Sequence, residues 1–143
     1  MTALRSLARK VNGAVDDRLS RLDDEQLLRI LRTSAGQRVL FTGLAVRLRA
    51  AAAKGLHATI QFDLTDEGKP AGTWTVGLDG VAGARARPRA AKEPSATLTL
   101  ELIDLGRMAA GRLDPGAAVM SGKLELQGDY GVLMRLSGFL SPH

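Results

Sequence analysis

The side chains that could carry out catalysis are few, and their spacing assembles no reactive set. His57 and His143 lie far apart in the chain, and neither stands at metal-ligand spacing from a cysteine or a second histidine. Ser121 lacks the G-x-S-x-G context of a nucleophile elbow, and Lys69 is not followed by the Ser or Thr of a phosphate-binding loop. We therefore expect no enzymatic activity, no metal site and no cofactor.

The charge of the chain favours an anionic partner. The net charge is +5 and the pI is about 10.2, a balance that suits nucleic acid, anionic lipid or an acidic protein. Aromatic residues, which stack on bases, make up only 3% of the chain, so nucleic acid is not expected. A basic cluster has two interpretations, a solvated sheet edge or contact with an anionic head group or membrane surface. The basic cluster consists of Arg85, Arg87, Arg89 and Lys92.

Cysteine content and hydropathy bear on the compartment. The sequence contains no cysteine, which excludes disulfides and thiolate chemistry. No stretch has the roughly 20 apolar residues that a membrane-spanning helix needs, and the N-terminal segment lacks the apolar core of a signal peptide. We therefore expect a cytoplasmic protein.

The first element that the sequence predicts is an amphipathic helix over residues 2–22. Its apolar side chains recur three and four positions apart, which is typical of one helical stripe. Such a helix could lie on a membrane surface, but docking on the main domain or pairing with a second copy is favoured. Self-association through this segment is therefore expected as one option.

Two further helices are expected before any strand. Asp23 is a suitable N-cap for a helix over residues 26–32. A break at residues 34–37 precedes a longer helix over residues 37–54, which Gly55 ends. The apolar side of the longer helix carries Val39, Leu40, Leu44, Leu48 and Ala52.

The period then changes to two, which is typical of strands. Strands are expected over residues 58–64, 73–78, 81–87, 96–102 and 123–127. The third is weak and charged, as edge strands often are. Asp104 and Asp114 are expected to cap short helices over residues 105–110 and 115–120, and Asp129 the last helix. Because each strand has one apolar and one polar face, helices should cover one face of the sheet.

Residues 113–129 carry a combination of short motifs that points to a family. An Asp-Pro pair opens a short helix, Met-Ser-Gly-Lys leads into a strand, and Gly-Asp opens the last helix. This combination resembles the signature of sterol carrier protein type 2 domains, and the resemblance covers roughly residues 56–140. Asp114 stands where the family often has Asn, and either residue can cap a helix. Other matching stretches are residues 60–63, 74–76, 96–100 and 105–111.

The resemblance implies an α+β fold: a five-stranded, mostly antiparallel sheet with helices packed on one face around an apolar cavity, preceded by N-terminal helices. It divides the chain into a helical extension (1–22) and a lipid-binding domain (23–143). Within that domain, leading helices (23–55) precede the family core (56–140). The implied cavity takes fatty acyl chains, fatty acyl-CoA, sterol-like molecules or phospholipids, and the family has no catalytic residues.

Candidate lipid-binding residues lie where the expected helices meet the sheet. Each could instead be plain core, since Leu and Phe at helical spacing usually are, and both interpretations stay open. The candidates are Phe41, Leu44, Leu48, Trp74, Met120, Met134 and Phe139. Four glycines could leave room for a ligand or could answer a bulge or close backbone approach. These are Gly72, Gly77, Gly83 and Gly106.

Two functions from different classes remain open. The first is non-catalytic binding and carriage of lipid, with transient contact to an anionic membrane surface. The alternative is a regulatory or scaffold module that uses the same fold with a collapsed core and associates through its N-terminal helices.

Overall fold

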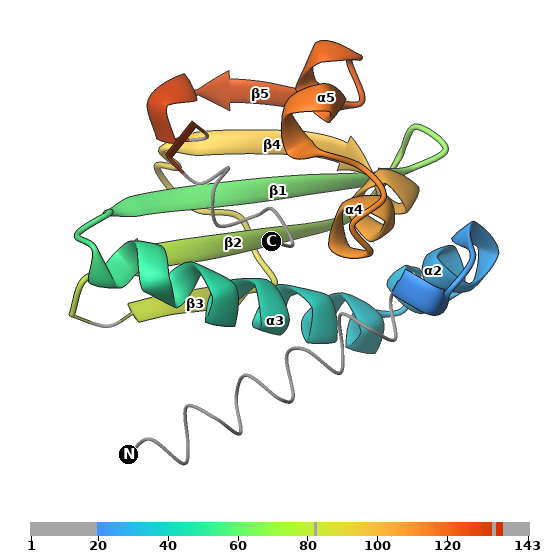
Figure 1. Ribbon diagram of the computed structural model, residues 1–143, viewed down its shortest axis with the longest axis horizontal. Helices are drawn as coiled ribbons and strands as arrows, with labels where there is room; N and C mark the ends of the chain where they lie inside the picture. The colour runs from blue at the N-terminus through green and yellow to red at the C-terminus, as the bar shows by residue number, and fades with distance from the viewer. Residues whose placement is uncertain (1–19, 82, 133, 136–143) are drawn as a thin grey trace.

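A five-stranded sheet with helices on one side forms the body of the protein (Figure 1). The structure is a computed structural model that describes residues 20–81, 83–132, 134 and 135. The elements are α2 (Asp24–Leu31), α3 (Ser34–Ala53), β1 (Ala58–Asp66), β2 (Lys69–Asp79), β3 (Gly83–Arg87), β4 (Ala96–Glu101), α4 (Leu102–Ala109), α5 (Pro115–Met120) and β5 (Leu124–Gly128). The expected helix over residues 2–22 lies almost wholly outside the described residues.

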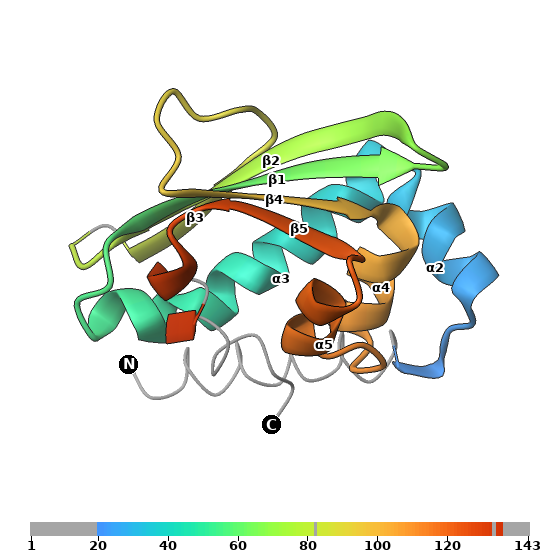
Figure 2. The same cartoon turned by 90° about the horizontal axis from the view of Figure 1, so that it is seen from above.

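The strands follow the order β3-β2-β1-β4-β5, so β3 and β5 form the two edges. The central pair β1–β4 is parallel, and the other three pairs are antiparallel. Figure 2 shows α3, α4 and α5 on one side of this sheet. The expected α+β fold is therefore confirmed, including the weak third strand at an edge. We call the helix-covered face of the sheet the inner face and the opposite one the outer face.

The core lies between the inner face and the helices. Alternate residues of β1 and β4 are buried, as period-two patterning predicts. Helix α3 packs against β2 and β3, α4 against β1 and β4, and α5 against β5. The burial of these apolar side chains is the main favourable contribution to folding.

Helix α3 begins three residues earlier than expected. The Thr33 hydroxyl accepts a hydrogen bond from the Gly36 backbone N–H at 3.0 Å, so the expected break is the first turn of the helix. Val39 is 58% exposed, which corrects its assignment to the apolar side. The buried side includes the expected Leu48 and Ala52, but it begins at Gln37 and Phe41, because contact with β2 and β3 sets the rotation of the helix.

Helix α4 also begins earlier than expected, directly after β4. Asp104 therefore lies inside its first turn and is not its cap, which corrects the expectation. The buried Asp104 carboxylate faces Arg107 of the same helix at 3.4 Å. The caps expected at Asp23 and Asp114 are confirmed, since both side chains accept backbone N–H groups of the following turn.

Two negative findings hold for the described part of the chain. None of its helices combines the length and apolar character needed to cross a membrane. No group of three or more described His, Asp or Glu side chains is arranged to hold a metal ion.

Candidate functional site

An aromatic cluster anchors α3 on the inner face of the sheet. The Phe41 ring stacks on Trp74 with ring centroids 5.0 Å apart and meets the edge of Phe62 at 5.2 Å. On the solvent side, the Arg38 guanidinium lies 5.8 Å from the Trp74 ring, within cation–π range. The cluster fixes one end of the helix against β1 and β2.

A single buried amide positions Trp74. The Gln37 Oε1 atom accepts a hydrogen bond from the Trp74 indole N–H at 3.0 Å. Its Nε2 atom donates to the carbonyls of Leu31 at 2.9 Å and Ala71 at 3.0 Å. Sequence reasoning missed this residue because a glutamine on a helix reads as a surface position. The register shift between Leu64 and Thr65, opposite Ala71, is the local irregularity beside the carbonyl that Gln37 uses.

The predicted lipid-binding residues fall into three groups. Phe41, Leu48 and Trp74 come together in the core between α3 and the sheet and are at most 4% exposed. Leu44 is half-buried on α3. Met120 is 89% exposed at the end of α5, and Met134 is 73% exposed. Phe139 lies outside the described residues.

Other apolar side chains at the margin of the core were not among the candidate lipid-binding residues, although Leu40 was expected on the apolar side of its helix. They are half-buried and pack against the core from α3, α4, α5 and β5 and from the connections before β1 and α5. Their place at the ends of apolar stripes is the sequence feature that could have identified them. They include Leu40, Leu56, Met108, Leu113, Val119 and Leu126.

The outer face carries a second feature, which the chain path creates. Edge strand β3 must connect to β4 across β2 and β1, and residues 88–95 make this crossing over the outer face (Figure 2). Side chains of the sheet hold the loop there. The Thr75 hydroxyl donates to the Arg89 carbonyl at 2.6 Å, and the Gln61 amide oxygen accepts from the Ala91 N–H at 3.0 Å.

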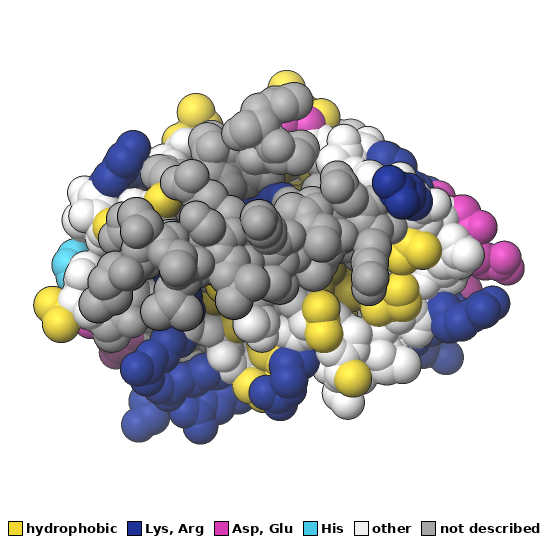
Figure 3. All heavy atoms as spheres, turned by 60° about the horizontal axis from the view of Figure 1, so that its bottom comes forward, with side chains coloured by type: hydrophobic (Ala, Val, Ile, Leu, Met, Phe, Trp, Pro, Cys, Tyr) yellow, Lys and Arg dark blue, Asp and Glu magenta, His cyan; other side chains and the backbone are white. Residues whose placement is uncertain are grey.

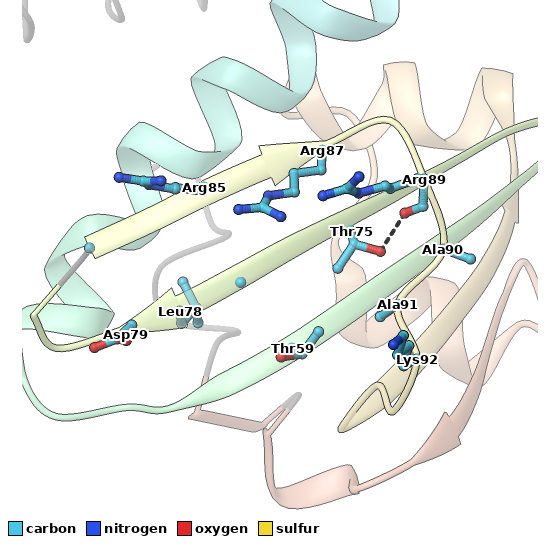
Figure 4. A pocket seen from close by; sticks show the side chains of 12 residues that line it. Thr59, Thr75, Leu78, Asp79, Arg85, Arg87, Arg89, Ala90, Ala91 and Lys92 are labelled. Atoms are coloured by element: carbon cyan, nitrogen blue, oxygen red, sulfur yellow. Dashed lines mark hydrogen bonds between the residues drawn. The ribbon is translucent and has the colours of Figure 1, made fainter.

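A pocket of about 740 Å³ lies between this loop, β3 and the sheet (Figure 4). Its floor includes Thr59, Thr75 and Gly77, and the whole basic cluster lines it. Sequence reasoning found the basic cluster but not the pocket, because the hollow depends on a loop that returns over the sheet.

The structure distinguishes between the two interpretations of the four glycines. At Gly72, a Cβ would lie 2.6 Å from the Gln37 side chain and φ is +147°, so close approach requires glycine. At Gly106, a Cβ would lie 3.1 Å from a side chain of α2, and Gly83 has a positive φ. Gly77 has open space at its Cβ position and no positive φ. The room at Gly77 lies on the outer face, away from the helices.

Comparison with known proteins identifies the family. The model of the SCP-2 sterol transfer family matches residues 44–141, so the chain belongs to this family. The family resemblance inferred from the sequence is thereby confirmed. The chain is 29% identical over 89 residues to hydroxysteroid dehydrogenase-like protein 2 of Xenopus laevis. The match covers 62% of this chain but 21% of that relative, so the chain spans about a fifth of the curated relatives it matches.

Solved structures support the same fold. Palmitated SCP2L2 from Aedes aegypti superposes with a TM-score of 0.60 at 21% identity, covering 73% of this chain and 93% of that one. An inverting sec-alkylsulfatase, Pisa1 from Pseudomonas sp., gives a TM-score of 0.58 at 24% identity. That match covers 71% of this chain and 16% of the sulfatase, so the similarity concerns a small part of that enzyme.

Proposed function

We propose that this chain binds lipid acyl chains between the inner face of the sheet and the helices, without catalysing a reaction. The observation that carries the proposal is the continuous apolar inner face in a chain of the SCP-2 sterol transfer family. A structural neighbour with 21% identity is described as palmitated, which makes a fatty acyl chain the first ligand to test. Fatty acyl-CoA, sterol-like molecules and phospholipids are the other candidates.

The proposed binding residues divide into a floor and a rim. Phe41, Leu48 and Trp74 would form the floor, since they are buried together against the sheet. Leu44 stands at the margin of α3, where an acyl chain could enter beside the helix. Met120 and Met134 would form an adaptable rim, because exposed methionines can repack around ligands of different shape. Phe139 remains a proposed contact on sequence grounds alone.

Leu44→Glu tests the proposal directly. A carboxylate at this half-buried position should reduce uptake of a fluorescent fatty acid about tenfold or more, because a charge beside an acyl chain is poorly solvated. Val39→Glu is the matched control, since it places the same charge on the exposed side of the same helix and should leave uptake unchanged. Native mass spectrometry of the purified protein provides an independent measurement of co-purified lipid.

The proposal fails if the unmodified protein carries no lipid and takes up no fluorescent acyl chain. Equal uptake by both variants and the unmodified protein would indicate that the ligand does not bind at the margin of α3. Thermal melting of both variants establishes that each one folds.

The alternative, a regulatory or scaffold module, is favoured by one observation. The described part of the α3–sheet interface is closely packed, with Phe41 and Leu48 both 0% exposed. A core of this kind could serve as a rigid platform instead of a pocket. Deleting residues 1–22 separates the two functions, because a scaffold should lose self-association while a lipid carrier should retain uptake. Light scattering measures the first property and fatty acid binding the second.

We also propose that the chain is not catalytic. The proteins named as a dehydrogenase-like protein and a sulfatase match it over only a small share of their length, so their names do not assign an activity to this region. We further infer that the protein acts in the cytoplasm, because a chain without cysteine forms no disulfide and therefore needs no oxidising compartment. Transient contact with anionic membranes belongs to the lipid-carrier proposal, and self-association through the N-terminal helices belongs to the scaffold alternative.

A further inference from the structure

The pocket on the outer face is rich in cations and poor in counter-charge. The basic cluster supplies three guanidinium groups and one ammonium group to its lining, and Asp79 is the one carboxylate among the lining residues. No ion pair joins a side chain of the basic cluster to any described carboxylate. In Figure 4 the guanidinium groups of Arg85, Arg87 and Arg89 form a row along the pocket. Figure 3 shows Lys and Arg side chains gathered on the side of the molecule where β3 lies.

The loop that roofs the pocket is held in place by the sheet. The Thr75 hydroxyl donates to the Arg89 carbonyl, which anchors Arg89 above β2. The Gln61 side chain bonds both the Ala91 N–H and the Asp63 carboxylate, at 3.0 and 2.9 Å. These bonds reduce the entropy that the loop would lose when a ligand binds, so the cations are partly preorganised.

The floor of the pocket is kept open by Gly77. No heavy atom lies within 4 Å of the position that its Cβ would take. Neither the backbone conformation nor close packing therefore requires glycine here, and its effect is to leave a hollow between Arg85 of β3 and Thr59 of β1, its two register partners. The described structure records no hydrogen bond for the Thr59 hydroxyl, which leaves a neutral donor on the floor.

We propose that this pocket is a second binding site, which takes a small organic phosphate. Guanidinium groups match the geometry of phosphate oxygens and can bind them in pairs, so a row of arginines suits one or more phosphate groups. The volume of about 740 Å³ is that of a site for a small molecule. A concave pocket beneath a loop is less suited to a flat membrane surface, and no aromatic side chain lines it for stacking on nucleic acid bases.

Isothermal titration with inorganic pyrophosphate and with ADP tests the proposal on the full chain at low salt. We expect saturable binding that weakens about tenfold or more in Arg87→Gln, which removes one guanidinium group from the row. Arg49→Gln is the charge-matched control, because Arg49 is exposed on α3 and does not line the pocket. Loss of the Arg49 charge should change the affinity for pyrophosphate and ADP by less than about twofold, because salt screens a distant charge.

Gly77→Thr supplies a variant that fills the hollow without removing a charge. Threonine suits a strand position and has open space here, so the variant should fold with an unchanged or higher melting temperature. Its pyrophosphate binding should fall about tenfold or more. Loss of binding in both Arg87→Gln and Gly77→Thr, with Arg49→Gln intact, would support the pocket.

Vesicles of phosphatidylcholine with and without phosphatidic acid distinguish the source of the phosphate. If the protein binds phosphatidic acid vesicles but neither soluble probe, and Gly77→Thr abolishes this binding, the site is supported and its ligand is a lipid head group. The proposal is overturned if neither soluble probe nor phosphatidic acid binds. It is also overturned if all three variants bind equally well, since that result indicates unspecific attraction by net charge.

Discussion

Glu101 uses one carboxylate to hold two parts of the chain together. From the end of β4 it accepts a hydrogen bond from the Thr65 hydroxyl of β1. It also accepts the backbone N–H groups of Glu67 at 2.8 Å and Gly68 at 3.3 Å, in the tight turn between β1 and β2. The hydrogen bond from Thr65, followed by those from Gly68 and Glu67, lowers the pKa of Glu101 despite partial desolvation.

Glu101→Gln should destabilise the fold by roughly 1–3 kcal/mol at neutral pH, because an amide cannot accept all three hydrogen bonds. Since the pKa of Glu101 is lower in the folded state, its stabilising effect is present above the unfolded-state pKa. It is lost as the pH falls through the folded-state pKa. The stability difference between the two proteins should therefore shrink in acid.

Urea unfolding across a series of buffers from neutral to acidic pH measures this difference. Glu125→Gln is the control, because Glu125 is exposed on β5 and should show little effect at any pH. A difference for Glu101→Gln that stays constant into strong acid would contradict the assigned role of its charge.

Among the elements, α3 depends on a polar contact as well as on its apolar side. Gln37 lies in its first turns and is 7% exposed. Through Leu31, Ala71 and Trp74 its amide connects α3 to two elements: the end of α2, and β2 at two points, Trp74 and the bulged start of the strand. The position of the helix over the sheet is therefore specified by directional bonds in addition to non-directional burial.

Gln37→Leu should lower the free energy of unfolding by roughly 2–4 kcal/mol, because the Trp74 indole N–H and two carbonyls would lose their partner. Thr42→Leu, at an exposed position of the same helix, should change it by less than about 0.5 kcal/mol. Chemical denaturation followed by Trp74 fluorescence measures both. Equal stability of Gln37→Leu and the unmodified protein would show that water replaces the lost partners.

Between α2 and α4, charge and close packing act together. Arg107 of α4 donates to the Asp24 carboxylate of α2 at 2.6 Å, and Arg112 reaches the same carboxylate at 3.3 Å. The hydrogen bond from Arg107 lowers the pKa of Asp24. Because these three side chains are 34–46% exposed, salt should screen their attraction in part. The packing of Gly106 against Leu27 and Leu31 does not depend on salt and adds to the contact between the two helices.

For the molecule as a whole, the sheet separates two proposed binding sites. The inner face would take an acyl chain beneath α3, and the outer face would take a phosphate beneath residues 88–95. A sheet whose residues alternate between two faces can change one face without disturbing the other. The two sites should therefore be occupied independently.

Cross-testing the two sets of variants measures this independence. Gly77→Thr should leave uptake of a fluorescent fatty acid unchanged, and Leu44→Glu should leave pyrophosphate binding unchanged. Each ligand should also bind with the same affinity, within about twofold, when the other is saturating. A larger shift would show coupling through the sheet, and it would indicate that strand positions move when one site fills.

Much of the architecture follows from local pattern. Alternation of apolar and polar residues in β1 and β4 predicts both strands, and the caps at Asp23 and Asp114 predict two helix starts, because these signals depend on neighbours in the chain. The helix starts at Ser34 and Leu102 were missed by a turn. The start at Ser34 follows from a local cap, Thr33, which the sequence analysis did not use. The start at Leu102 follows from the direct passage of β4 into α4, without an intervening loop or a side-chain cap.

The amino-acid order alone determined the family, the alternating sheet and the cationic stretch beside its edge. Only the tertiary structure decided what those residues face. The close approach of Gln37 requires glycine at position 72, whereas Gly77 leaves a hollow. In the sequence both are glycines of a predicted strand or of its start, and nothing distinguishes them. The basic cluster lines a pocket because residues 88–95 must cross the outer face to reach β4. Such long-range closure depends on strand order, which no local pattern of side chains specifies.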